Sequence, residues 1–420
     1  MSADLRGKVL QTNDRLAPEL LKFAQELIKV RSVTGEEGEA QSLVRDKLKS
    51  LGASIDYWKP RREDFKGYEA FVEEERNVGL RPNVVGRFRG RPSKRVLAFN
   101  GHIDVVPEGD PTSWRYPPFE ARLVGGRLFG RGACDMKAGL AAVIFAIESL
   151  LDSGVALRND ILVESVVGEE SGGLGTLATI RRGYVPDGTI IAEPTNLEPT
   201  IIQAGCLMFR LTVRGKAAHG ASRYMGVSAV EKFQPILLAL QALEKRRAAM
   251  KRLPIYAGIP NPVALSIGKV RAGDWDSTVP ESLVAEGRYG VWPRERLNAA
   301  RSMFETAVAT ASSKDAWLAE HPPQVSWFGP QWESAGISSS HWLTKFIQRA
   351  FNDALHFRPK LAGITGGTDM RLFTRVANKP AILFGPGDSS VAHFRDEHVE
   401  VASVIHACKV YSMAALAWNE

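Results

Sequence analysis

Residues 136–170, MKAGLAAVIFAIESLLDSGVALRNDILVESVVGEE, predict the fold of the larger part of this chain. The first half is apolar on nearly every side, as expected of a helix that packs on a sheet, and the second half is an apolar run that ends in two carboxylates. The segment GTIIAEPT (188–195) repeats that second pattern. Strands that alternate with helices in this way indicate a layered α/β domain with a mixed, largely parallel sheet.

The sequence pattern changes after residue 206. From about residue 207 an alternating strand is followed by a helix, two further strands and a second helix, which is typical of a small α+β unit. The α/β pattern returns near residue 330. At 420 residues, the chain also exceeds the size at which a single core stops growing. We therefore predict a discontinuous catalytic domain, 1–206 and 330–420, interrupted by a smaller ferredoxin-like domain over 207–329.

Composition narrows the possible partners. The chain carries 54 Lys and Arg against 47 Asp and Glu, a net charge of +7. The basic residues are spread out and no nucleic-acid recognition motif accompanies them, so we expect a solvated surface and no nucleic-acid partner. No apolar run reaches the about 18 residues that predict a membrane span, and residues 1–16 lack the apolar core of a signal peptide.

The cysteines point to a reducing compartment. Cys134, Cys206 and Cys408 are odd in number and widely scattered, which does not suit a disulfide framework. We expect a cytoplasmic protein without disulfides or a membrane partner.

Two segments near the N-terminus are informative. The amphipathic stretch LAPELLKFAQELIKV ends at RSVTG, and TGEE (34–37) predicts a capping box with Thr34 as N-cap and Glu37 reaching back. The charged stretch over 59–82 predicts a surface excursion, which either shapes a substrate mouth or is a plain loop.

Polar residues recur where apolar strands end. Most lie in NGHIDVVPEGD (100–110), GACDMKAG (132–139), VVGEESGG (166–173), IAEPT (191–195) and GPGDSSVAHFRDEHV (385–399). Because the carboxyl ends of strands in an open α/β sheet form the ligand-binding edge, we expect these side chains to lie together. Carboxylates that crowd together repel one another unless cations lie between them. Two imidazoles with three or four carboxylates suit zinc, cobalt or manganese, and Asp135 is the candidate to bridge two such ions.

These five motifs, in this order, resemble the zinc-dependent amidohydrolase and metallopeptidase family that contains acetylornithine deacetylase, succinyl-diaminopimelate desuccinylase, aminoacylase and carboxypeptidase G. The resemblance runs from VRSVTGEE (30–37) to AHFRDEHV (392–399). It implies two divalent ions, with zinc the first choice. His102 and Glu193 would hold one ion, Glu170 and His393 the other, and Asp135 would bridge them.

The resemblance also implies catalytic roles. Glu169 matches the family's general base, and Asp104 fits a residue that orients the His102 ring. His219, in GKAAHGASRYMG, matches a histidine that reaches the active site of a partner subunit, which implies a homodimer paired through the inserted domain.

Substrate-binding elements are the loosest part of the match. Arg288 and the TGGTDMR loop, with Gly367, Thr368 and Arg371, resemble the family's binding elements for a substrate carboxylate and backbone. In DSTVP (276–280), Ser277 stands where many relatives carry Asn.

We predict a metal-dependent hydrolase that cleaves the amide bond of a small N-acyl amino acid or related N-acyl amine, by metal-bridged hydroxide with Glu169 as general base. The alternatives are a dipeptidase or carboxypeptidase, and a deformylase or aminohydrolase of an unusual aromatic compound. Outside the enzymes, an inactive metal-binding interaction protein remains.

Overall fold

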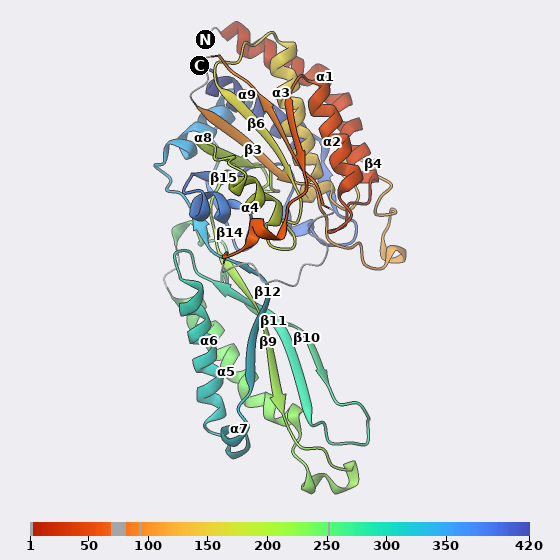
Figure 1. The fold of residues 1–420 in the computed structure, drawn as a ribbon, viewed down its shortest axis with the longest axis vertical. Helices are drawn as coiled ribbons and strands as arrows, with labels where there is room; N and C mark the ends of the chain where they lie inside the picture. The colour runs from red at the N-terminus through yellow and green to blue at the C-terminus, as the bar shows by residue number, and fades with distance from the viewer. Residues whose placement is uncertain (1–2, 69–80, 92–94, 251–252) are drawn as a thin grey trace.

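The computed structural model of the chain describes residues 3–68, 81–91, 95–250 and 253–420. The chain folds into two bodies, one above the other in Figure 1. The upper body contains a large sheet covered by helices, and both chain ends lie in it. The lower body contains a smaller sheet with α5 and α6 alongside, and the strands β9 and β12 lead from one body to the other.

Within these described residues, the large sheet has nine strands and is parallel at its centre. In spatial order its strands are β1 (Ser54–Trp58), β2 (Asn83–Phe88), β6 (Asp160–Val166), β3 (Val96–His102), β7 (Gly188–Ile191), β15 (Ala381–Leu383), β8 (Thr200–Gln203) and β13 (Ala335–Gly336), with β14 (Ala362–Ile364) also paired to β8. The four neighbours β6, β3, β7 and β15 run parallel, whereas the pairs β1–β2 and β2–β6 are antiparallel. The predicted mixed sheet is confirmed, with parallel pairing at its centre, and the carboxyl ends of the four central strands share one edge.

Helices cover this sheet. They are α1 (Ala3–Lys29), α2 (Gly38–Ser50), α3 (Ala138–Asp152), α4 (Leu174–Arg181), α8 (Trp342–Leu355) and α9 (Val401–Trp418). Nearly every residue of α3 is buried, because α3 packs on the sheet and against both α1 and α9. Within the described ranges, α9 is the one helix long and apolar enough to cross a membrane by length and composition, and 61% of it is buried inside the protein.

The small sheet is antiparallel, with the order β10 (Leu265–Ala272), β11 (Ser282–Val291), β9 (Gly205–Arg214) and β12 (Gln324–Trp332). Buried residues alternate along β9 and β11, and they pack with α5 (Ala229–Ala249) and α6 (Leu297–Ser312), followed by the short α7 (Ala316–Glu320). This order and these two helices are the ferredoxin-like arrangement that the sequence predicts. A third sheet joins β16 (His398–Glu400), β5 (Arg127–Phe129) and β4 (Arg122–Val124).

The predicted capping box is wrong. The helix α2 begins at Gly38, one residue after Glu37, and no side chain caps it. The Thr34 hydroxyl instead donates to the Asp104 carboxylate at 3.3 Å, and the buried Glu37 carboxylate accepts hydrogen bonds from Arg81. The side chains of Thr34 and Glu37 therefore make tertiary contacts rather than capping the helix.

Two other predictions concern the charged stretch over 59–82 and the cysteines. Most of the predicted excursion, residues 69–80, lies outside the described residues, and its first part contains a short helical turn, Arg62–Phe65, with Phe65 buried. The three cysteines are all free and buried.

One close contact fixes α3 against the sheet. Gly139 lies in the first turn of α3, where a Cβ atom would come within 2.3 Å of the Ala192 carbonyl oxygen. Ala192 directly precedes Glu193 at the end of β7, so this glycine lets the helix approach the strand end that carries a candidate metal ligand.

Replacing Gly139 by Ala should lower the free energy of unfolding by about 1–3 kcal/mol, the usual cost of overpacking. The matched control is Gly7→Ala in α1, where a Cβ atom meets nothing within 4 Å. That control should leave stability unchanged or raise it by up to about 1 kcal/mol, since Ala favours helix. Guanidinium unfolding followed by circular dichroism measures both, and equal stabilities would contradict the close approach.

Candidate metal centre

The predicted ligands come together at the carboxyl edge of the large sheet. His102 is the last residue of β3, while Glu169, Glu170 and Glu193 follow the ends of the adjacent strands β6 and β7. Asp135 lies in the turn that precedes α3, where its peptide bond to the next residue is cis. The parallel strands thus deliver side chains from distant sequence positions to one place.

His102 and Asp135 form the first half of the centre. The Nε2 atom of His102 lies 3.0 Å from Asp135 Oδ1 and 4.0 Å from Glu193 Oε1. The opposite ring nitrogen, Nδ1, lies 2.9 Å from the backbone carbonyl oxygen of Asp104, which holds the ring with Nε2 towards the carboxylates. Side-chain atoms of His102, Glu169 and Glu193 all lie within 4.8 Å of one another.

His393 completes the second half. Its Nε2 atom lies 2.9 Å from Glu170 Oε1 and 3.5 Å from Asp135 Oδ2, so the two oxygens of Asp135 face one histidine each. Tetrahedral zinc with ligand bonds of about 2.0–2.1 Å places its ligand atoms about 3.3 Å apart. The spacing of these donors fits divalent ions, one on each side of Asp135.

Electrostatics also indicate that the cluster needs positive charge. Burial raises the pKa of Glu169 well above its usual value, and Glu193 and Asp369 raise it further. Burial likewise raises the pKa of Glu193, with Asp135 adding to the effect. Hydrogen bonds to Asp135 and Glu170 raise the pKa of His393 to about 10. In the metal-free protein, protonated imidazoles therefore supply the charge that cations would otherwise supply.

Asp104 supports two parts of the site at once. Its carboxylate is fully buried and accepts the backbone N–H groups of Glu169 at 3.2 Å and Glu170 at 3.3 Å. The carboxylate lies 3.7 Å from His102 Nδ1, beyond hydrogen-bond distance, so the backbone carbonyl of Asp104 orients the ring. The side chain of Asp104 holds the turn that carries Glu169 and Glu170.

A buried ion pair that sequence reasoning missed ties the turn of Asp135 to the turn of His393. Glu397 accepts the backbone N–H groups of Cys134 at 2.9 Å and Asp135 at 3.0 Å. Arg131 pairs with Glu397 at 2.7 Å and donates to the His393 carbonyl oxygen at 3.3 Å. Glu397 follows His393 by four residues, and this spacing in the sequence could have marked it as part of the site. Nothing in the sequence marks Arg131 as part of the site.

The arginines predicted to bind substrate are engaged with the protein. Arg371 is fully buried, and its guanidinium donates to the carbonyl oxygens of Thr368 at 2.8 Å and Gly172 at 2.7 Å. Arg288 donates to the carbonyl oxygen of Thr365 at 2.6 Å. Arg371 and Arg288 therefore brace the TGGTDMR loop, one from within the large body and one from β11.

The other predicted binding residues also lie in packed surroundings. A Cβ atom at Gly367 would come within 2.3 Å of the Trp332 side chain, so the glycine permits the loop to pass the tryptophan. Thr368 is buried, and its hydroxyl donates to Gln203.

His219 lies apart from the cluster in its own chain. It is exposed and its Nδ1 atom accepts the Ala221 N–H at 3.1 Å. It follows β9, a strand of the small sheet that runs away from the large body (Figure 1) for ten residues, about 33 Å, before this loop. The structure therefore does not bring His219 to the metal ligands of the same chain.

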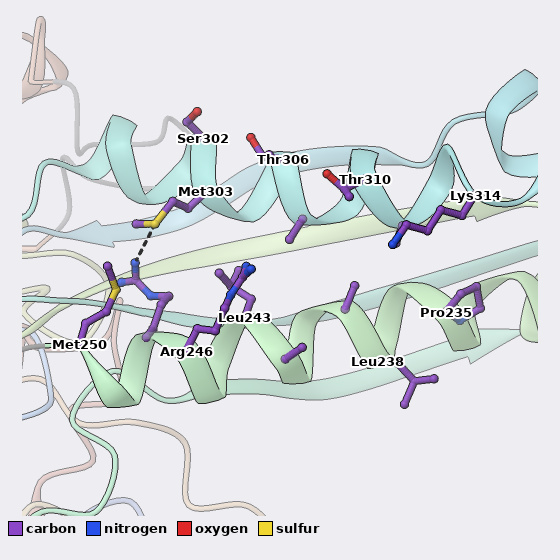
Figure 2. Close-up of a pocket in the computed structure, with 15 residues that line it drawn as sticks. Pro235, Leu238, Leu243, Arg246, Met250, Ser302, Met303, Thr306, Thr310 and Lys314 are labelled. Atoms are coloured by element: carbon purple, nitrogen blue, oxygen red, sulfur yellow. Dashed lines mark hydrogen bonds between the residues drawn. The ribbon is translucent and has the colours of Figure 1, made fainter.

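A separate cleft of about 780 Å³ lies between α5 and α6 (Figure 2). Its described lining combines apolar side chains such as Leu238 and Met250 with hydroxyls such as Thr306 and with basic residues such as Arg246. This lining contains no histidine, cysteine or carboxylate, so the cleft offers neither metal ligands nor acid–base groups.

A layered α/β body with two histidines on either side of one aspartate, at the carboxyl edge of its large sheet, is an arrangement that suits a metal-dependent hydrolase. Residues 98–417 match the model of Peptidase family M20/M25/M40, and the chain belongs to that family. The resemblance drawn from the motifs is confirmed, and with it the prediction of a hydrolase that acts on amide carbon–nitrogen bonds.

Individual relatives are distant. The chain is 27% identical to an N-formyl-4-amino-5-aminomethyl-2-methylpyrimidine deformylase of Halalkalibacterium halodurans, over 96% of this chain and 95% of that protein. It is 28% identical to a probable succinyl-diaminopimelate desuccinylase of Staphylococcus epidermidis, over 77% and 84%. The M20 family metallo-carboxypeptidase Sso-CP2 of Sulfolobus solfataricus has the same fold, with a TM-score of 0.75 at 17% identity and coverage of 96% and 99%.

Metal binding should depend steeply on pH. Hydrogen bonds raise the pKa of His393 to about 10, and Asp135 and Glu193 raise that of His102 despite burial, so both imidazoles are protonated at neutral pH without metal. A metal ion must displace these protons, so affinity rises with pH. We expect zinc binding at pH 7 to release about two protons and to strengthen up to about a hundredfold per pH unit. Calorimetry in buffers of different ionisation enthalpy measures the release, and a pH-independent dissociation constant would contradict it.

Proposed function

We propose that this protein is a cytoplasmic deacylase that removes a small acyl group from an amine, with Glu169 as general base. The observation that carries this proposal is a buried glutamate beside a two-sided ligand cluster, next to a loop whose arginines are already engaged. A formyl group is the first acyl group to test, because the relative named as a deformylase matches 96% of this chain.

The metal assignment follows the donors. His102 and Glu193 would hold one ion, Glu170 and His393 the other, and Asp135 both, with zinc preferred over manganese or cobalt for this nitrogen and oxygen set. When bound, the ions supply Lewis-acid polarisation of the acyl oxygen and lower the pKa of water.

Glu169 supplies proton transfer. Burial and the charge of Glu193 raise its pKa well above the usual glutamate value, which brings it closer to the working pH of a base that accepts and then returns a proton. Glu169 would take a proton from the attacking water and deliver it to the leaving amine. Asp104, through the backbone N–H of Glu169, would keep the carboxylate directed at the cluster.

The second candidate is a dipeptidase or carboxypeptidase. Such an enzyme binds a free amino or carboxyl end, and an arginine fork is the usual partner for a carboxylate. The engagement of Arg371 and Arg288 with backbone oxygens favours a substrate that does not depend on a free carboxylate. Faster hydrolysis of dipeptides than of N-acyl amines would favour this second candidate.

The inserted domain, 207–329, is the proposed dimerisation and lid element. The exposed position of His219, far along the small body from its own cluster, supports a homodimer in which this imidazole enters the partner subunit's site. There it would stabilise the oxyanion that forms on the acyl group.

Replacing Glu169 by Gln should leave zinc content and fold intact and lower turnover of N-formyl and N-succinyl amines by about a hundredfold or more, since general-base catalysis contributes about 10²–10⁴. The matched control is the adjacent Glu170→Gln, which should lose bound zinc. Mass-spectrometric product detection and metal analysis give both results. Full turnover by Glu169→Gln would overturn the assignment of Glu169 as general base. If the unaltered protein binds metal but turns over none of these substrates, an inactive metal-binding protein is favoured.

Mixing two inactive variants tests the shared site. In a heterodimer of His219→Ala and Glu169→Gln chains, one of the two sites has both Glu169 and the partner subunit's His219. Statistical exchange of subunits should therefore restore about a quarter of the unaltered activity. Each variant alone is the control, and a mixture no more active than its components after exchange would remove His219 from the partner's site.

A further inference from the structure

A buried ion pair that belongs to no metal ligand lies behind the turn that carries the proposed base. The Nε atom of Arg81 lies 2.9 Å and 3.1 Å from the two carboxylate oxygens of Glu37, and the Nη2 atom also donates to Glu37. The side chains are 2% and 0% exposed. Glu37 comes from the TGEE segment, whose capping role the structure overturns, so its function is open.

Arg81 touches the base turn directly. A Cβ atom at Gly168 would come within 2.9 Å of Arg81 Nη2, so the guanidinium packs against the backbone immediately before Glu169. Gly168 has a φ of +70°, in the left-handed region that favours glycine. The turn is therefore shaped so that Arg81 can lie against it.

The segment that carries Glu37 is linked to the same turn through Thr34 and Asp104. The segment that leads to Glu37 is tied to the end of β3: Ser32 Oγ donates to the Ile103 carbonyl at 2.6 Å, and Thr34 N donates to the Val105 carbonyl at 3.1 Å. Thr34 Oγ1 donates to Asp104, whose carboxylate holds the backbone N–H groups of Glu169 and Glu170.

Charge explains why an arginine is required. Glu37 and Asp104 are both almost completely buried and repel each other electrostatically. Buried carboxylates are stable only when paired with a cation or well hydrogen-bonded, and removing the cation leaves an uncompensated charge. The planar guanidinium pairs with Glu37 through two nitrogens while one of them, Nη2, also lies against Gly168, an arrangement that a single ammonium group does not reproduce.

We propose that Glu37 and Arg81 are positioning residues for Glu169, which fix the turn 168–170 against Asp104 so that the base keeps its alignment with the metal centre. The inference rests on the proposed role of Glu169. It assigns to the N-terminal TGEE segment a part in catalysis, although neither side chain of the pair belongs to the ligand cluster.

Replacing Arg81 by Lys tests the proposal. We expect zinc content and KM to stay within about twofold and kcat to fall about tenfold to a hundredfold, because misalignment of a catalytic group lowers the rate of the chemical step. The matched control is Arg247→Lys in α5, since Arg247 is equally buried and pairs with Glu295 through two contacts of 2.7 Å. An equal loss of kcat in both variants, or loss of zinc from Arg81→Lys, would overturn the proposal.

A double-variant cycle separates this inference from the proposed function. If Arg81 acts through Glu169, adding Arg81→Lys to Glu169→Gln should change the residual rate by less than about twofold. A full additional loss would overturn the positioning role. Should Glu169→Gln itself keep full turnover, the proposed base fails, a result distinct from either outcome of the Arg81 comparison.

A second variant guards against misfolding. Glu37→Gln keeps the shape and one acceptor oxygen, and it should lower kcat without loss of zinc in the same way. If Arg81→Lys does not fold and folded Glu37→Gln has unchanged kcat, the proposal is overturned.

Discussion

The repulsion between carboxylates at one sheet edge is the constraint on which the rest of this structure depends. Asp135, Glu169, Glu170 and Glu193 are drawn together because β3, β6, β7 and the turn before α3 end at the same place. Their burial removes the water that would otherwise screen them. Burial, and then repulsion between neighbouring carboxylates, raises the pKa values of Glu169 and Glu193, and the spacing of the histidine nitrogens on either side of Asp135 fits divalent cations.

The same constraint accounts for the buried arginines around the site. Arg131 compensates Glu397 while both hold backbone atoms of the Asp135 and His393 turns, and Arg81 compensates Glu37 behind Glu169. Each ion pair is too well buried to be an effective stabiliser by itself, since desolvation offsets most of the attraction between the charges. Their value lies in geometry: a guanidinium fixes two partners at once, and the backbone of a ligand-bearing turn is one of them.

The sequence predicts the parts of the site that depend on strand ends, and it fails where contacts join distant turns. Residues such as His102 and Glu193 could be placed at the site because an apolar run that predicts a strand precedes each of them, and the carboxyl ends of parallel strands share an edge. The TGEE segment was misread because a capping box and a pair of tertiary contacts use the same residue types. Arg131 and Arg81 could not be assigned, because an arginine at the end of a charged stretch has the sequence signature of a solvated one. The base and metal roles themselves remain predictions.

The proposed substrate preference follows from what the two candidate arginines already bind. A guanidinium that recognises a substrate carboxylate must keep its N–H donors free of protein acceptors until the substrate binds. In an open site, water can hydrogen-bond to these donors in the meantime, which keeps the free-energy cost of leaving them unpaired small. Arg371 is instead fully buried, with two donors on the carbonyl oxygens of Thr368 and Gly172, and Arg288 donates to Thr365. Freeing either one would break hydrogen bonds to backbone carbonyl oxygens, each worth about 0.5–1.5 kcal/mol. The contacts hold the loop in a form in which these donors are already used, which supports the proposal of an N-acyl amine substrate over a peptide with a free carboxyl end.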